Sequence, residues 1–183
     1  SENPESAKIT DLGREGAVIG ENNKWSSWEF TIPEDGRYAI KLVYLALPGK
    51  GKDIEFSLKL DDKIPFSEAS RLSLSRIWKD FGKPERDSRG NDLRPSQVEV
   101  SRWNTRPLMN TEGYYDEAYA FYLTKGTHRL TLTSVQESMA IAEIRVGNDE
   151  PLPSYQEYSA GAKAADAYIK IFEAEQTLEK SSS

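Results

Sequence analysis

Apolar and polar residues alternate in several short stretches of the chain, which is the pattern of strands that bury one face. In the strongest of these, Tyr38–Leu47, alternation puts Tyr38, Ile40 and Leu42 on one side. The same alternation recurs in Trp28–Ile32, Ile54–Leu60, Tyr119–Leu123, Arg129–Thr133 and Met139–Val146. At least six strands with turns between them, and no segment of helical period among them, predict an all-β fold built as an antiparallel β-sandwich or barrel.

Turn residues separate these strands. Pro33–Gly36 and Pro48–Gly51 are turns, because proline presets φ and glycine supplies positive φ. Residues 64–75 are ambiguous and could hold a short strand together with a short helix near Phe66–Ala69. Residues 78–113 form a long polar segment in which Gln97–Val100 could be a short strand. Long connections of this kind are often functional.

The last thirty or so residues have a different character. Pro151 and Pro153 interrupt the strand pattern, and Ser154 with Glu157 forms a capping box for a short C-terminal helix over Tyr155–Ala167. A strand start follows in the segment 168–175. We therefore divide the chain into a sandwich module, residues 1–150, and a helical linker with the start of a following module, residues 151–183.

The order of these segments is similar to a known group of domains. Trp25–Tyr44 resembles the opening of galactose-binding-like jelly rolls, which include the family 6 and family 35 carbohydrate-binding modules. Ile54–Asp61 resembles their central strand, Gly126–Leu132 their glycine-x-histidine hairpin and Met139–Val146 their closing strand. Ile171–Glu175, with its Glu-Ala-Glu, is similar to the first strand of another such module.

The resemblance implies a non-catalytic carbohydrate-binding module of a larger secreted or cell-surface protein. The segment Pro151–Tyr158 and the long inserted loop resemble modules attached to extracellular solute-binding proteins of Gram-positive bacterial sugar ABC transporters. The implied partners are a glycan or oligosaccharide and neighbouring domains of the same chain. The resemblance also allows a structural Ca²⁺, held partly by backbone carbonyls, and no other cofactor.

Composition narrows the chemistry. The 183 residues contain no Cys and one His, which excludes disulfides, thiolate nucleophiles and sites of several histidines. The net charge is −6 and no basic block is present, so nucleic acid is a poor partner. No apolar run approaches the roughly 18 residues of a membrane helix, and we expect no membrane insertion.

Aromatic residues are the candidates for sugar binding, because a pyranose ring can lie on an aromatic face while nearby polar groups bond its hydroxyls. Those in the predicted loops and strand ends are Trp103 with Asn104, Tyr114, Trp78 and Trp25. Each has a structural alternative: Trp78 and Trp103 could anchor the long loop, and Trp25 could be buried. Trp28, inside an alternating strand, is expected in the core.

One departure from the family pattern leaves other functions open. Sugar-binding members often carry an Asn just before the closing strand, where this chain has Ala140, so the site could be relocated or absent. The second hypothesis is therefore a structural or interdomain sandwich module without a glycan ligand. A third, a glycan-active enzyme, requires a cleft with two carboxylates. His128 is expected to be structural, because no catalytic partners accompany it in the sequence.

Overall fold

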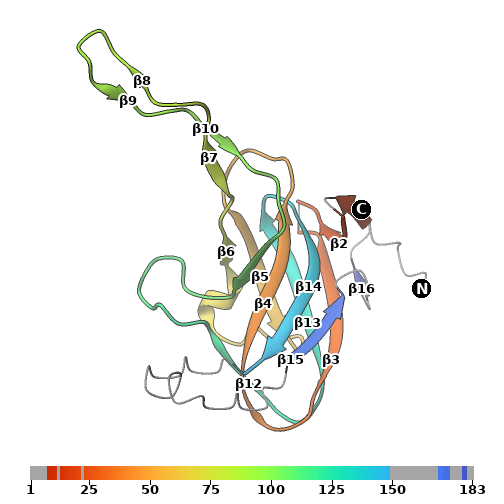
Figure 1. Cartoon of the computed structure of the whole chain (residues 1–183). Helices are drawn as coiled ribbons and strands as arrows, with labels where there is room; N and C mark the ends of the chain where they lie inside the picture. Colours follow the sequence, from red (N-terminus) through yellow and green to blue (C-terminus); the bar gives the residue numbers. More distant parts are fainter. Residues whose placement is uncertain (1–7, 12, 22, 149–168, 174–178, 181–183) are drawn as a thin grey trace, which may run out of the picture.

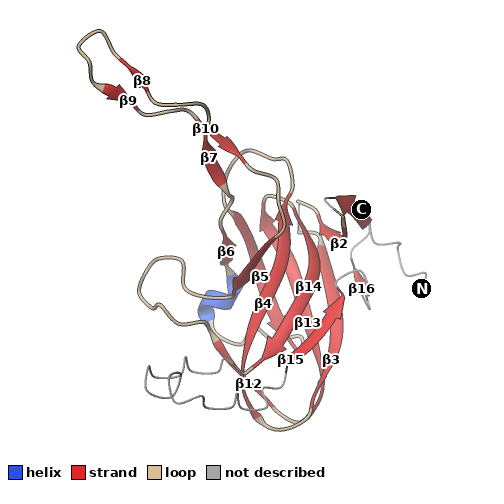
Figure 2. Ribbon diagram, viewed as in Figure 1, coloured by secondary structure: helices blue, strands red, loops and turns tan. Residues whose placement is uncertain are grey.

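The chain, in a computed structural model, is a sandwich of two antiparallel sheets (Figures 1 and 2). The structure describes residues 8–11, 13–21, 23–148, 169–173 and 179–180. The first sheet consists, in spatial order, of β1 (Lys8–Asp11), β2 (Arg14–Ile19), β14 (Met139–Gly147), β4 (Gly36–Ala46) and β11 (Asn104–Pro107). Strand β12 (Ala120–Leu123) also pairs with β4, and β15 (Ile169–Glu173) pairs with β14.

The second sheet has the order β16 (Glu179–Lys180), β3 (Trp25–Ile32), β13 (Gly126–Gln136), β5 (Ile54–Leu60) and β6 (Leu72–Leu74). The antiparallel sandwich predicted from the alternation is thus confirmed. A short 3₁₀ helix, Ser67–Ser70, precedes β6, so both elements predicted in the ambiguous segment are present. The predicted C-terminal helix Tyr155–Ala167 lies outside the described residues.

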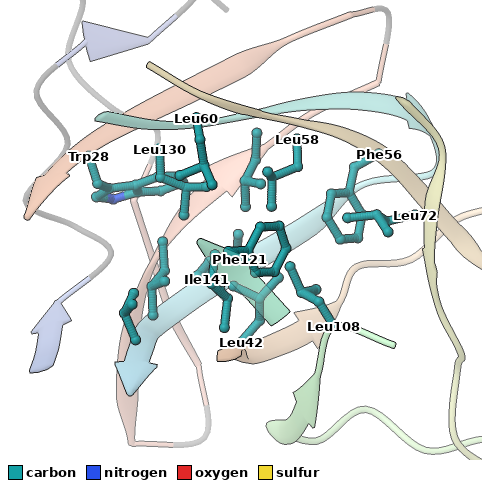
Figure 3. Close-up of a cluster of buried hydrophobic side chains, with 14 of the residues drawn as sticks. Trp28, Leu42, Phe56, Leu58, Leu60, Leu72, Leu108, Phe121, Leu130 and Ile141 are labelled. Atoms are coloured by element: carbon teal, nitrogen blue, oxygen red, sulfur yellow. The ribbon is translucent and has the colours of Figure 1, made fainter. Parts of the chain in front are cut away.

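The core lies between the two sheets (Figure 3). Alternate side chains point inward because successive residues of a strand face opposite sides of the sheet. Trp28 is 1% exposed, as predicted. The other large side chains of the core come from both sheets and include Tyr38, Leu42, Tyr44, Phe56, Leu58, Leu130 and Ile141.

Strand β15 adds to the first sheet at the edge of β14, and the start of a following module near Ile171 stays a prediction. The strand pairs with Glu143–Gly147 of β14, on the side where β2 covers only Met139–Ile141. The physical reason is the strand edge, because the N–H and C=O groups that β2 leaves unpaired need partners.

The long polar segment forms a hairpin that projects from the sandwich (Figure 1). We call residues 77–100 the arm. Its base pairs β7 (Trp78–Asp80) with β10 (Gln97–Glu99), which confirms the short strand predicted there, and its outer part pairs β8 (Glu85–Arg86) with β9 (Asp92–Leu93). At the tip, the Asp87 carboxylate accepts hydrogen bonds from the Arg89 and Asn91 backbones.

Candidate functional site

A pocket of about 280 Å³ opens at the edge of the sandwich, between the two outermost strands β6 and β11. Neither strand has a further neighbour in its sheet on that side. Its polar lining residues are Ser73, Ser75, Arg106, Asn110 and Thr111, and its apolar ones are Leu74, Pro107 and Met109. A concave site with apolar walls and a few placed polar groups is the usual form of a small-ligand site.

The polar groups of this pocket combine a cationic donor with hydroxyls that can both donate and accept hydrogen bonds. Arg106 contributes a guanidinium with five N–H groups, and Ser73, Ser75 and Thr111 contribute hydroxyls. No Asp or Glu is among the residues that line it. The pocket is therefore suited to a ligand rich in hydroxyl and ring oxygens, and its lining lacks the carboxylate pair of a glycosidase.

Asn110 links the pocket to an exposed loop, residues 108–119. Its Oδ1 accepts hydrogen bonds from the backbone N–H groups of Glu112 and Tyr114, at 2.9 and 3.3 Å. This oxygen is occupied, so the amide NH₂ is the part of the side chain left for a ligand. The Tyr119 N–H donates to the Leu108 carbonyl and closes the loop.

Two tyrosines stand at the tip of this loop. Tyr114 is 73% exposed and Tyr115 is 69% exposed. Their neighbours Asn110 and Thr111 line the pocket, so the two rings lie within the same loop as the pocket wall. Of the candidate aromatics, Tyr114 is the one that the structure brings next to this concave surface.

Asn104 also lies close to the pocket, through a buried tyrosine. Its Nδ2 donates to the Tyr44 hydroxyl at 3.3 Å, and that hydroxyl donates to the Ser75 carbonyl at 2.7 Å. Burial raises the pKa of the Tyr44 phenol, against the opposing effects of the Asn104 hydrogen bond and the positive charge of Arg106. The neutral phenol therefore ties β11 to the residues after β6, across the back of the pocket.

Trp103 has a packing role. A Cβ on Gly16 would lie 2.6 Å from the Cη2 atom of Trp103, so the indole ring covers β2 at the one residue without a side chain. Trp103 is partly buried there. Its ring therefore holds the chain against the first sheet, away from the pocket.

The other two candidate tryptophans lie elsewhere. Trp25 is partly buried at the start of β3, opposite Thr133 of β13 in the second sheet. Trp78 is 44% exposed at the base of the arm, with its ring in van der Waals range of the Cβ position of Gly51. The structure thus gathers Tyr114 and Asn104 near the pocket and places Trp103, Trp25 and Trp78 at separate positions.

A buried arginine fixes the base of the arm. The Arg76 side chain is 0% exposed and donates to the carbonyl oxygens of Lys52 and Leu47 and to the carboxylates of Glu99 and Glu137. The Lys50 N–H adds hydrogen bonds to Glu137. Four segments that are distant in sequence meet at this guanidinium. No local sequence motif predicts this contact.

The position before the closing strand, where the resemblance expects a ligand-binding Asn, carries no free polar side chain. Ala140 is 0% exposed, and the Ser138 Oγ accepts the Glu21 N–H. Glu137 is held by Arg76. A ligand site, where present, has to lie elsewhere, and the pocket at the β6–β11 edge offers one. Sequence reasoning missed Ser73, Ser75, Arg106 and Asn110, because common polar residues in separate segments form no recognisable motif.

His128 is structural in its contacts. It is buried, its Nδ1 lies 2.7 Å from Asp61 Oδ2, and its Nε2 lies 2.7 Å from the Thr124 carbonyl oxygen. Both partners are acceptors, and only a doubly protonated ring can donate at both nitrogens. Burial lowers the pKa of His128, but the hydrogen bonds to Thr124 and Asp61 and the charge of Asp61 outweigh it and leave the pKa raised.

The described part of the chain brings no three His, Cys, Asp or Glu side chains together as metal ligands. Within the same described residues, no helix is long and apolar enough to cross a membrane.

Comparison with known families and with curated proteins gave no match for this chain, either to a family model or to a single protein. Among solved structures, the chain is similar to the native structure of a family 35 carbohydrate-binding module from Clostridium thermocellum. The TM-score is 0.37 and the identity 12%, over 75% of this chain and 82% of that one.

Proposed function

We propose that this chain is a non-catalytic carbohydrate-binding module that holds a glycan in the pocket between β6 and β11. Binding is an equilibrium process, in which hydroxyl and ring oxygens of the sugar accept hydrogen bonds from the pocket and an aromatic ring covers its apolar face. In this proposal the module belongs to a larger secreted or cell-surface protein, such as the solute-binding component of a sugar ABC transporter. The larger protein supplies the neighbouring domains.

One observation carries the proposal: the loop 108–119 contributes to the wall of a polar pocket and also carries two exposed tyrosine rings. Loops on a rigid sheet are the usual carriers of binding residues, and two consecutive exposed rings offer a face on which a sugar ring can lie. Arg106 and Asn110 line the pocket, and Tyr114 and Tyr115 stand beyond it in the same loop. Asn104, through Tyr44, supports the wall from behind.

In this proposal the three candidate tryptophans contribute less to glycan binding than Tyr114. Trp78 is the most exposed of the four tryptophans and lies on the arm, whose base continues from the pocket wall at Ser75. Trp103 and Trp25 are partly buried, so they contribute to glycan binding by shaping the surface around them.

The alternative is a structural or interdomain module without a glycan ligand. The observation that favours it is the arm, which exposes Phe81 and Leu93 to solvent as a docking element for a neighbouring domain would. Under this alternative the pocket stays without a sugar, and Tyr114 and Tyr115 contact protein instead.

The test is a glycan array screen of the whole chain, followed by calorimetry on each glycan that is retained. We expect Arg106→Met and Tyr114→Ala to weaken binding by about tenfold or more, which corresponds to ~1.4 kcal/mol. The matched control is Tyr122→Ala, since Tyr122 is an equally exposed tyrosine on β12, away from the pocket. Absence of binding to every glycan, or binding that the pocket variants leave unchanged in folded protein, would overturn the proposal.

A further inference from the structure

The pocket wall and the arm are one continuous stretch of chain. Ser73, Leu74 and Ser75 line the pocket, and the chain then runs directly into β7 of the arm, as Figure 1 shows. It returns through β10 and reaches the opposite wall of the pocket at Arg106. The arm is therefore an insertion between the two walls of the pocket.

The arm has two faces, and one of them is used to hold it in place. Arg76 bonds the Lys52 carbonyl and Trp78 packs at Gly51, so both face the loop between β4 and β5. Glu99, which lies opposite Trp78 in the register, also bonds Arg76. This face is turned toward the body of the sandwich.

The other face continues the pocket. Because side chains at alternate positions of an extended chain share a face, Ser73 and Ser75 are followed on it by Ile77, Lys79 and Phe81. Val98 lies opposite Lys79, and the Phe81 N–H donates to the Ser96 carbonyl on the neighbouring strand. At about 3.3 Å per residue, the row from Ser75 to Phe81 is about 20 Å long.

The end of this row is an exposed aromatic ring. Phe81 is 68% exposed, and the Lys79 side chain is exposed and has no hydrogen bond or ion pair to the described residues. The pocket alone, at about 280 Å³, has room for a small ligand only. Tyr114 and Tyr115 belong to the loop whose residues Asn110 and Thr111 line the pocket, and Phe81 ends the row on the arm.

We infer that the ligand is a linear glycan several sugar units long, bound from the pocket along the outer face of the arm to Phe81. This rests on the proposed function and specifies its substrate class, a chain rather than a single terminal sugar. Phe81 stacks on a sugar ring remote from the pocket, and Lys79 donates to hydroxyls between the two. The buried Arg76 keeps the row in line with the pocket before ligand arrives, which reduces the ordering cost of binding.

The experiment measures affinity against chain length. Ladders of xylo-, manno-, cello- and galacturono-oligosaccharides, from disaccharide to octasaccharide, are titrated into the unaltered chain, Phe81→Ala and Tyr114→Ala. We expect affinity to rise with length and Phe81→Ala to lower it about tenfold for the longest members only, while Tyr114→Ala weakens binding at all lengths. Tyr122→Ala again serves as the control.

The outcomes separate the two proposals. The extended site is overturned if affinity stops rising at the disaccharide, or if Phe81→Ala affects short and long members equally. Either result still agrees with glycan binding in the pocket. Failure of every ladder to bind the unaltered chain overturns the glycan-binding function and the extended site together. A circular dichroism melt of each variant shows that a lost affinity is not a lost fold.

Discussion

The Arg76 Nη2 atom donates to the Glu137 Oε2 atom at 2.6 Å, in a pair whose side chains are 0% and 1% exposed. The two residues are 61 positions apart in sequence and join the base of the arm to the turn between β13 and β14. A Cβ on Gly49 would overlap the Glu137 carboxylate, so the glycine lets the β4–β5 loop close over the pair.

Removal of one partner of this pair should destabilise the protein strongly. Glu137→Ala leaves the Nη2 end of the buried guanidinium without its carboxylate partner, with the partly exposed Glu99 as the remaining counter-charge, and loss of a buried ion-pair partner costs about 3–5 kcal/mol. Chemical denaturation measures the change in the free energy of unfolding. Arg86→Ala is the control, because it breaks the exposed Arg86–Asp92 pair, for which ~0–1 kcal/mol is typical. Similar losses for both variants would contradict the anchoring role of Arg76.

The His128–Asp61 pair should make stability depend on pH. The raised pKa of His128 means that its contribution is complete below the unfolded value, about 6.5, and is lost as the pH rises through the folded value. Urea unfolding midpoints from mildly acidic to alkaline pH should therefore fall, and the fall should be smaller in His128→Gln. An NMR titration that places the pKa of His128 below its ordinary value would contradict the doubly protonated ring.

Asp61 contributes on the acid side with the opposite sign. Burial raises the pKa of its carboxyl, but hydrogen bonds from the Arg129 backbone and His128, with nearby positive charge, leave it lowered. Its contribution is present above the unfolded value, about 3.9, and is lost as the pH falls through the folded value. Asp61→Asn should reduce the loss of stability in acid. An acid unfolding curve identical to that of the unaltered chain would contradict this.

Gly16 should not tolerate a side chain. In Gly16→Ala the new methyl group meets the Trp103 ring at 2.6 Å and the Ile141 carbonyl oxygen at 3.1 Å. The ring has to move, and overpacking of this kind costs about 1–3 kcal/mol. Tryptophan fluorescence should shift to the red as Trp103 becomes more exposed. Gly20→Ala is the control, because its nearest contact is Lys24 Cγ at 3.7 Å; equal shifts would contradict the packing role of Trp103.

Asn110 should have two separable roles. Asn110→Ala removes the acceptor that holds the Glu112 and Tyr114 N–H groups, so the loop 108–119 loosens and glycan affinity falls. Asn110→Asp keeps this acceptor but replaces the NH₂ donor by an oxygen, so the loop stays ordered while affinity still falls. Amide hydrogen exchange across the loop, read beside calorimetry, distinguishes the variants. Full affinity in Asn110→Asp would show that the amide does not face the ligand.

The sandwich was predictable from the sequence because burial follows the chain locally. The alternation in Tyr38–Leu47 fixes which side chains face the core, and Trp28 is buried as expected. The candidate site was predictable in part. Tyr114 is exposed beside the pocket, whereas Trp103 is used to cover Gly16, a contact between segments far apart in the chain.

By itself, the sequence determined the strands, their inward faces and the absence of thiol and multi-histidine chemistry, because these depend on residue type and spacing. The tertiary structure decided where polar residues from separate segments meet. Arg106 of β11 and Ser75 after β6 share a pocket only because each lies on the free edge of a different sheet. The same holds for Arg76, whose partners come from three other segments and hold the base of the arm against the sandwich.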